Sequence, residues 1–290
     1  MKSAPFGYHR ASSAAEAVEL LQAYDGTARV IAGGQSLVPM MNMRLLRPDA
    51  IIDLAGIAEL AEIRAVNDTT EVGAMVRYAT LERSPVAAER LPLLARVVRH
   101  IGDRQVRNRG TIGGSLVHGD PTAEMALACL VLGATLRALG PDGFREIPIE
   151  EFYTGSYATV LDPCEVVTEI VFPARPDHLA FAECCRRHND FAVISVACVG
   201  NRTSSGRWTD VRVALGGVGD GPVLAEASNR RLSGSLLSDE DINAAAGAAL
   251  EAVDPPSDVR ASAEYRLHLV PVYVRRVLSE LRRAGASSKG

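Results

Sequence analysis

The chain has 290 residues, more than one typical domain, so we expect roughly two or three packed units. Of these residues 47% are hydrophobic and 23% charged, a composition typical of a folded protein. Its formal net charge of -4 and sequence pI of about 5.9 provide no overall electrostatic attraction for nucleic acid or for an anionic membrane. No uninterrupted apolar stretch is long enough to span a bilayer, and the N-terminal residues lack the apolar core of a secretory signal, so we expect a cytoplasmic protein without an integral membrane segment.

The first part of the chain predicts a small unit of alternating helices and strands. Ser13 and Glu16 have the spacing of a capping box, which predicts a helix to about Tyr24, ended by the turn at residues 25–26. Residues 29–32 and 50–54 are short β-rich runs, separated by a paired glycine and a second apolar segment. This order favours an α/β or α+β unit.

Residues 56–173 repeat this order of elements. We expect short strands at 61–66 and 71–73 around an Asn-Asp turn, and a helix at 91–101, where apolar residues recur at helical spacing. A second glycine loop follows at 110–114. An alanine-rich apolar run then predicts a buried helix over 122–132, with strands at 134–138 and 166–172.

A proline-rich linker at 173–177 separates the last part of the chain. Beyond it we expect strands at 191–199 and 211–215, the second closed by a glycine-rich turn at 216–221. Helices are expected at 239–253 and at 259–283, and the second of these is amphipathic. The tail at 285–290 is expected to be disordered.

The cysteines do not indicate a metal centre or a disulfide framework. Their number is odd and no CxxC pair is present, whereas an iron–sulfur cluster needs four closely spaced thiolates. The vicinal pair Cys184-Cys185 could be redox-active, but free cysteines more often serve as small apolar packing residues. We expect no metal ligands in this chain.

Two paired-glycine segments are the strongest chemical signal. At 32–36 (AGGQS) a β-rich run leads into two glycines and two hydrogen-bonding side chains, and at 111–115 (TIGGS) two glycines lie between hydroxyl residues. Without Cβ atoms, such backbone can approach a ligand closely and gather its amides around a phosphate. Each pair alone is more often an ordinary turn, but two similar segments favour a dinucleotide site. Asp120 and Glu124 follow as acceptors suited to ribose or ribityl hydroxyls.

With both glycine segments, the sequence resembles the FAD-binding medium subunits of bacterial molybdenum hydroxylases of the carbon monoxide, nicotine and xanthine dehydrogenase type. The matching stretches cover nearly the whole chain: 32–54, 101–125, 155–173, 214–223 and 261–278. The first two are the most specific.

This resemblance implies an α+β fold in which two subdomains hold an extended FAD, followed by a C-terminal domain with a small antiparallel sheet and helices. The expected divisions are 1–55 for the first FAD-binding subdomain, 56–175 for the second, 178–284 for the C-terminal domain and 285–290 for the tail.

The resemblance also implies the residues that hold FAD. Residues 32–36 correspond to the pyrophosphate cradle and 111–115 to the rest of the phosphate and ribityl region, and the loop near residue 190 would approach the flavin from the C-terminal domain. That loop has Arg-Arg-His-Asn-Asp where the family pattern is closer to Arg-Arg-x-Gly-Asp. The expected cofactor-binding residues are Val30, Ile31, Ala32, Gly33, Gly34, Gln35, Ser36, Leu37, Ile101, Thr111, Ile112, Gly113, Gly114, Ser115, Asp120, Glu124, Leu161, Arg187, Asp190 and Phe191.

The implied function is that of an oxidoreductase subunit without catalytic side chains of its own. It would pass electrons from the [2Fe-2S] clusters of a small partner subunit through FAD to an external acceptor, while a large molybdenum-cofactor subunit hydroxylates the substrate. Such subunits would assemble as a dimer of heterotrimers. The alternative is a stand-alone FAD-dependent oxidoreductase, since partner subunits would lie on other chains.

Overall fold

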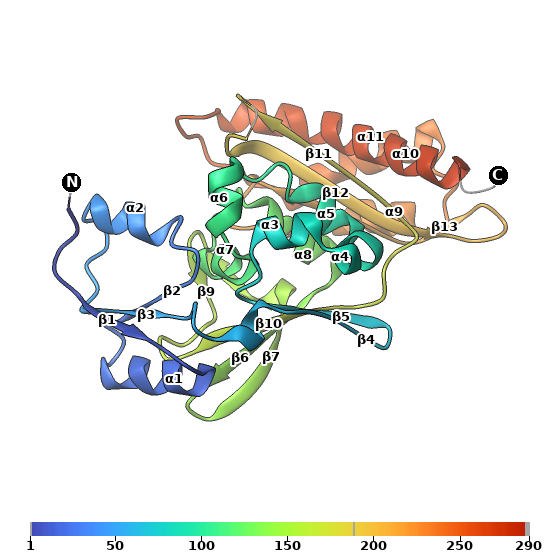
Figure 1. The fold of residues 1–290 in the computed structure, drawn as a ribbon. Coiled ribbons are helices and arrows are strands. Elements are labelled where there is room, and N and C mark those ends of the chain that lie inside the picture. Colours follow the sequence, from blue (N-terminus) through green and yellow to red (C-terminus); the bar gives the residue numbers. More distant parts are fainter. Residues whose placement is uncertain (1, 188, 288–290) are drawn as a thin grey trace.

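The computed structural model describes residues 2–187 and 189–287 and has three units along the chain (Figure 1). The first unit contains a parallel sheet with strand order β1-β3-β2. Ser13 begins α1 by accepting a hydrogen bond from the Glu16 backbone N–H (3.1 Å), as the sequence predicts. The Glu16 carboxylate, however, binds Ser12 rather than Ser13. The elements are β1 (Gly7–Arg10), α1 (Ala14–Ala23), β2 (Arg29–Ile31), α2 (Leu37–Asn42) and β3 (Ala50–Asp53).

The second unit contains a five-stranded antiparallel sheet with strand order β4-β5-β10-β6-β7. Strand β7, the last in this order, was not predicted from the sequence. A two-stranded hairpin, β8 with β9, follows it. The strands are β4 (Ile63–Val66), β5 (Thr69–Gly73), β6 (Thr135–Gly140), β7 (Gly143–Pro148), β8 (Tyr153–Gly155), β9 (Ala158–Thr159) and β10 (Val166–Phe172), with short 3-10 turns η1 (Ala58–Ala61) and η2 (Ile149–Glu151).

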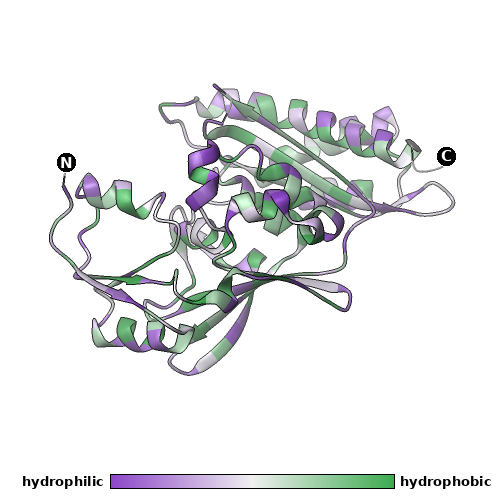
Figure 2. Ribbon diagram, in the orientation of Figure 1, coloured by the Kyte–Doolittle hydropathy of each residue, from purple (hydrophilic) through white to green (hydrophobic). Residues whose placement is uncertain are grey.

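The helices of this unit are shorter and more numerous than the sequence suggested. The predicted helix at 91–101 is a helix only to Val97, and Pro85 and Pro92 each begin a new helix, where a missing N–H costs nothing. The run of arginines before the second glycine segment forms a helix, α6, which is largely hydrophilic (Figure 2). The helices are α3 (Tyr78–Arg83), α4 (Pro85–Arg90), α5 (Pro92–Val97), α6 (Arg104–Arg109), α7 (Ile112–His118) and α8 (Glu124–Leu132).

The third unit is a four-stranded antiparallel sheet, β11-β12-β13-β14, covered by helices. Its first strand and α9 were not predicted. The last helix includes residues 285–287 of the tail that was expected to be disordered, and 288–290 lie outside the described residues. The elements are β11 (His178–Cys185), β12 (Ala192–Arg202), β13 (Trp208–Gly216), β14 (Val223–Leu224), α9 (Glu226–Leu232), α10 (Asp239–Ala248), η3 (Ala249–Ala252) and α11 (Ala263–Ser287).

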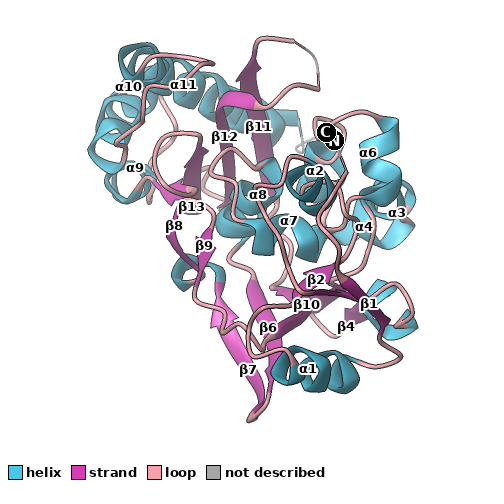
Figure 3. Ribbon diagram, turned by 90° about the vertical axis from the view of Figure 1, so that its left-hand side faces the viewer, coloured by secondary structure: helices cyan, strands magenta, loops and turns pink. Residues whose placement is uncertain are grey.

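Strand β12 connects the second and third units because both of its faces are buried. Ala197 and Val199 belong to the core of the second unit, whereas Val196 and Cys198, on the opposite face, pack in the core beneath α11. Helix α8 packs on β12 and β13 from one side, and α10 and α11 lie on the other side of the sheet (Figures 1 and 3). The expected α+β fold is confirmed.

Two absences apply to the residues that the structure describes. None of their helices is both long enough and apolar enough to cross a bilayer. They also contain no group of three or more His, Cys, Asp or Glu side chains arranged to hold a metal ion.

Candidate cofactor site

The first glycine segment is an open turn between β2 and α2. The backbone of Leu54 donates to the Ile31 carbonyl (3.2 Å) and so holds the end of β2 against the sheet. Gly34 has φ +73°, a left-handed conformation that favours glycine, and the Gln35 side chain donates to the Gly33 carbonyl (3.3 Å). The segment is therefore a defined turn rather than a loose loop.

The amides of this turn are available to a ligand. Within the described residues, the backbone N–H groups of residues 33–36 find no acceptor in the protein. Four successive N–H groups without acceptors can donate to an anion with several oxygens. Helix α2 has only 6 residues, so the contribution of its dipole is secondary to these individual hydrogen bonds.

The second glycine segment differs from the prediction because it is the first turn of a helix and not an open loop. Thr111 caps α7, and its hydroxyl accepts from the Gly114 N–H (3.1 Å). Gly113 donates to the Ala74 carbonyl (2.9 Å), and Ser115 donates to the Thr111 carbonyl (3.1 Å). Its amides from 112 to 115 are thus all bonded within the protein, which leaves mainly hydroxyl groups for a ligand.

The two segments lie against each other. A Cβ atom on Gly33 would overlap the Arg109 carbonyl and lie 2.8 Å from the Gly110 Cα. A Cβ atom on Gly114 would lie 3.3 Å from that of Ala32. The glycines therefore let the turn after β2 approach the start of α7 backbone to backbone, which joins the first and second units at this point.

A buried acidic cluster lies at the start of α8. Glu124 is 8% exposed, and burial, followed by the charges of Glu183 and Asp120, raises the pKa of its carboxyl to about 7. Asp120 accepts hydrogen bonds from the Thr122 backbone (2.9 Å) and hydroxyl (2.8 Å). The cluster offers acceptors with few protein donors, as a ligand rich in hydroxyl or amino groups requires.

Glu183 is a member of this cluster that sequence reasoning missed. It comes from β11 of the third unit, its side chain is 5% exposed, and its Oε1 lies 2.9 Å from His100 Nδ1. Its Oε2 is buried without a hydrogen-bond partner among the described residues. The available signal was a charged residue inside an apolar run, but no strand was predicted there. An orphaned buried oxygen fits a hydrogen-bond donor supplied by a bound molecule.

The remaining predicted residues are more dispersed. Ile101 and Leu161 are half-buried and pack on the core of the second unit. Arg187 has a side chain that is 87% exposed, and it faces Asp190 across 3.7 Å. Phe191 is exposed, with the Arg260 guanidinium 4.5 Å above its ring. Residue 188 of this loop lies outside the described residues.

A cavity of about 440 Å³ adjoins this last group, and Arg186, Arg187, Asp190, Val259 and Arg260 line it. Tyr157 contacts the acidic cluster, because its hydroxyl donates to Asp120 Oδ2 (3.4 Å). The backbone of Tyr157 has φ +58°, which is strained for an aromatic residue. Its side chain is exposed. Partial burial of the hydroxyl and the nearby Asp120 carboxylate raise the pKa of this group.

Two protein-family models match the chain. The first, described as the FAD binding domain in molybdopterin dehydrogenase, matches residues 4–175, and the second, the CO dehydrogenase flavoprotein C-terminal domain, matches residues 179–281.

Individual proteins match over almost the full length of both partners. The nicotine 6-hydroxylase medium subunit of Paenarthrobacter nicotinovorans is 39% identical over 97% of this chain and 98% of its own length. Among solved structures, carbon monoxide dehydrogenase from Hydrogenophaga pseudoflava is 37% identical with a TM-score of 0.95, covering 98% of this chain and 99% of the matched chain. Quinoline 2-oxidoreductase from Pseudomonas putida 86 is 35% identical with a TM-score of 0.94, over the same shares.

Proposed function

The chain belongs to the family of FAD-binding medium subunits of molybdenum hydroxylases, and on that premise we propose how its own residues hold the cofactor and serve electron transfer. The protein is a flavoprotein oxidoreductase subunit that carries FAD. It works with a small [2Fe-2S] subunit and a large molybdenum-cofactor subunit, together forming a dimer of heterotrimers. The alternative of a stand-alone flavoprotein is not supported, because relatives that match end to end are medium subunits.

The turn at 33–36 is the pyrophosphate cradle in this proposal. The single observation that carries it is the row of backbone N–H groups without acceptors, which a pyrophosphate would satisfy. The start of α7 closes the cradle from the other side with the hydroxyls of Thr111 and Ser115. Its glycines serve close packing, since a Cβ on Gly113 would lie 2.7 Å from the Ala74 carbonyl oxygen.

The acidic cluster holds the hydroxyl-bearing part of the cofactor. Asp120, Glu124 and Glu183 present carboxyl oxygens from two different units, and Glu183 has an oxygen free to accept. Because Glu183 belongs to the third unit, binding of FAD would tie that unit to the second. Ile101 and Leu161 supply apolar surface beside the rings, and Arg187, Asp190 and Phe191 approach the flavin from the loop after β11.

FAD supplies the redox chemistry when bound: it accepts electrons from the partner's clusters and passes them to an external acceptor. The side chains around it position the cofactor and exclude water. Nothing in this proposal requires a nucleophile or a metal ligand on this chain.

A cytoplasmic location is also part of the proposal. Fractionation of cells that produce the protein would test it, and recovery in a periplasmic or membrane fraction would contradict it.

The function is tested by absorption spectra of the chain purified alone and together with the chains encoded beside it. We expect the lone chain to show a flavin spectrum, and the co-purified complex to add iron–sulfur absorbance and molybdenum. A chain that stays colourless after incubation with FAD would overturn the cofactor site. A chain that binds FAD but never co-purifies with partners would overturn the assembly and leave the site intact.

A further inference from the structure

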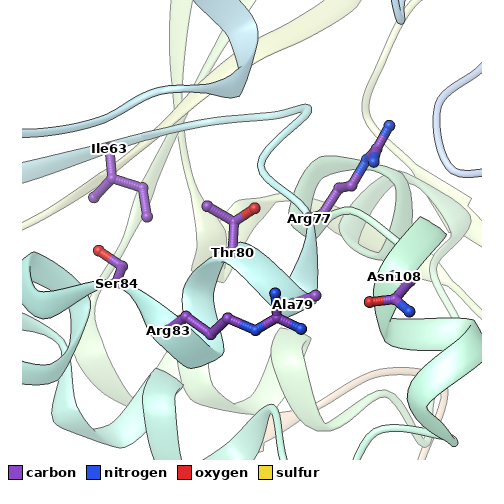
Figure 4. Close-up of a pocket in the computed structure, with 7 residues that line it drawn as sticks. All are labelled: Ile63, Arg77, Ala79, Thr80, Arg83, Ser84 and Asn108. Atoms are coloured by element: carbon purple, nitrogen blue, oxygen red, sulfur yellow. The ribbon is translucent and has the colours of Figure 1, made fainter.

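A separate cavity of about 610 Å³ opens between α3, the start of α4 and α6 of the second unit (Figure 4). None of the residues assigned to the cofactor lines it. Its walls carry two guanidinium groups, two hydroxyls, a carboxamide and two apolar side chains, which belong to Arg77, Arg83, Thr80, Ser84, Asn108, Ile63 and Ala79.

The two arginines of this cavity lack partners. In the described part of the chain, neither Arg77 nor Arg83 forms an ion pair or donates a side-chain hydrogen bond. Neighbouring arginines differ in this respect, since Arg64 binds Glu71 and Glu169, and Arg107 binds Glu82. The nearby carboxylates are therefore already engaged, and no acidic residue lines the cavity. Each of the two guanidinium groups is therefore free to donate to a bound anion.

The other polar groups can all donate to an anion as well. The Thr80 hydroxyl and the Asn108 carboxamide make no hydrogen bond to another described residue. The Ser84 oxygen accepts from the Ala87 N–H (3.2 Å) at the start of α4, which leaves its own hydrogen free to donate. A guanidinium can bind phosphate or carboxylate through two parallel hydrogen bonds, and the hydroxyls and amide can satisfy the remaining oxygens.

The cavity has a fixed position next to the second glycine segment. The backbone of Arg77 pairs with Thr111, and the Tyr78 N–H donates to the Gly110 carbonyl (3.0 Å). Arg77 is thus anchored on well-bonded backbone at one wall of the cavity. Asn108, on α6 and two residues before Gly110, lies on the same side of the cavity as Arg77 (Figure 4). The walls belong to packed secondary structure and not to a free loop.

We propose that this cavity binds a small molecule carrying a phosphate group, at a site distinct from the FAD cradle. The organic group that carries the phosphate would pack against Ile63. A carboxylate is also an oxyanion that these donors could bind, and the experiment distinguishes carboxylate-bearing from phosphate-bearing molecules.

The test uses the chain saturated with FAD, so that the cradle at 33–36 is filled. Inorganic phosphate, AMP and succinate are titrated at constant ionic strength, and binding is measured by calorimetry and by the unfolding temperature. We expect phosphate and AMP to bind, AMP more tightly, and succinate to bind weakly. The double variant Arg77→Gln/Arg83→Gln should weaken phosphate and AMP binding by about tenfold or more, because both charged donors are lost.

The matched control is Arg230→Gln/Arg231→Gln, which removes the same charge from α9 at residues with no partner among those the structure describes. It should leave AMP binding unchanged. Equal weakening in both double variants, or no binding of any of the three probes, would overturn the proposal, and preference for succinate would overturn its phosphate part. Loss of FAD from the Arg77/Arg83 variant, seen in the flavin absorbance, would show that the cavity belongs to the cofactor site and is not distinct. If that variant does not fold, Thr80→Val provides the same comparison with one donor removed.

Discussion

Gly33 and Arg109 meet backbone to backbone, so closely that a Cβ atom on Gly33 would overlap the Arg109 carbonyl. Gly33 belongs to the turn after β2 of the first unit, and Arg109 ends α6 of the second. Main-chain atoms cannot move aside as a flexible side chain can. The contact therefore fixes the distance between the proposed pyrophosphate cradle and the start of α7.

Gly33→Ala should separate these two segments and weaken FAD binding severely. The overlap is with backbone, so we expect a cost of about 3 kcal/mol or more, shared between stability and cofactor affinity. Flavin content after purification and the FAD dissociation constant measure it. Gly219→Ala is the control, since a Cβ there meets nothing within 4 Å and the variant should keep its FAD. Stoichiometric, tightly bound FAD in the Gly33 variant would contradict the assigned contact.

Thr111→Ala should destabilise the protein by about 1 kcal/mol, because it removes the oxygen that accepts from the Gly114 N–H at the start of α7. It should also lower FAD affinity, because in the proposed site the Thr111 hydroxyl belongs to the wall of the cradle. Ser238→Ala removes a comparable cap from α10, in the third unit, and should destabilise the protein without changing FAD affinity. Urea unfolding and FAD titration separate the two effects. Equal FAD affinity in both variants would mean that Thr111 acts only as a cap.

Glu124 should make the stability of the FAD-free protein fall as pH rises from about 4.5 to about 7. Its pKa is raised in the folded state, so over this range the folded protein binds more protons than the unfolded chain. The penalty for ionisation is complete above pH 7 and amounts to about 3 kcal/mol. Glu124→Gln cannot ionise and should flatten the slope in urea unfolding at pH 5, 6, 7 and 8. An unchanged slope would show that this carboxyl does not titrate in that range.

Arg266→Met should destabilise the third unit by about 3 kcal/mol or more. The guanidinium is buried, binds Asp258 (2.9 Å) and the Gly217 carbonyl (2.8 Å), and also donates to the Val193 carbonyl. The substitution orphans these acceptors. Arg275→Met, on the exposed face of the same helix, should change the free energy of unfolding by less than about 0.5 kcal/mol. Similar unfolding midpoints for the two variants would refute this role.

Local features of the sequence were sufficient for the start of α1, the strand β2 that precedes the first glycine pair, the buried helix α8 and the family. Each depends on neighbouring residues: a cap and the amide three positions on, or an apolar run and the turn that ends it. The elements that were missed include β7, β11 and α9. Their composition is mixed, and β7 and β11 are stabilised by pairing with the strands β6 and β12. Helix α6 was not predicted because its mostly charged and polar residues form no apolar stripe.

The sequence by itself determined that two glycine pairs and two acidic residues occupy positions that match the FAD-binding stretches of the family. Only the tertiary structure decided how the two pairs differ. The amides at 33–36 have no acceptor among the described residues, whereas that of Gly113 is bonded to Ala74, a residue distant in the sequence. The structure likewise brought Glu183 beside Glu124 from another unit and left Arg77 and Arg83 together without carboxylates. Whether a polar group is satisfied depends on what the fold places within about 3 Å of it, and that neighbour is often remote along the chain.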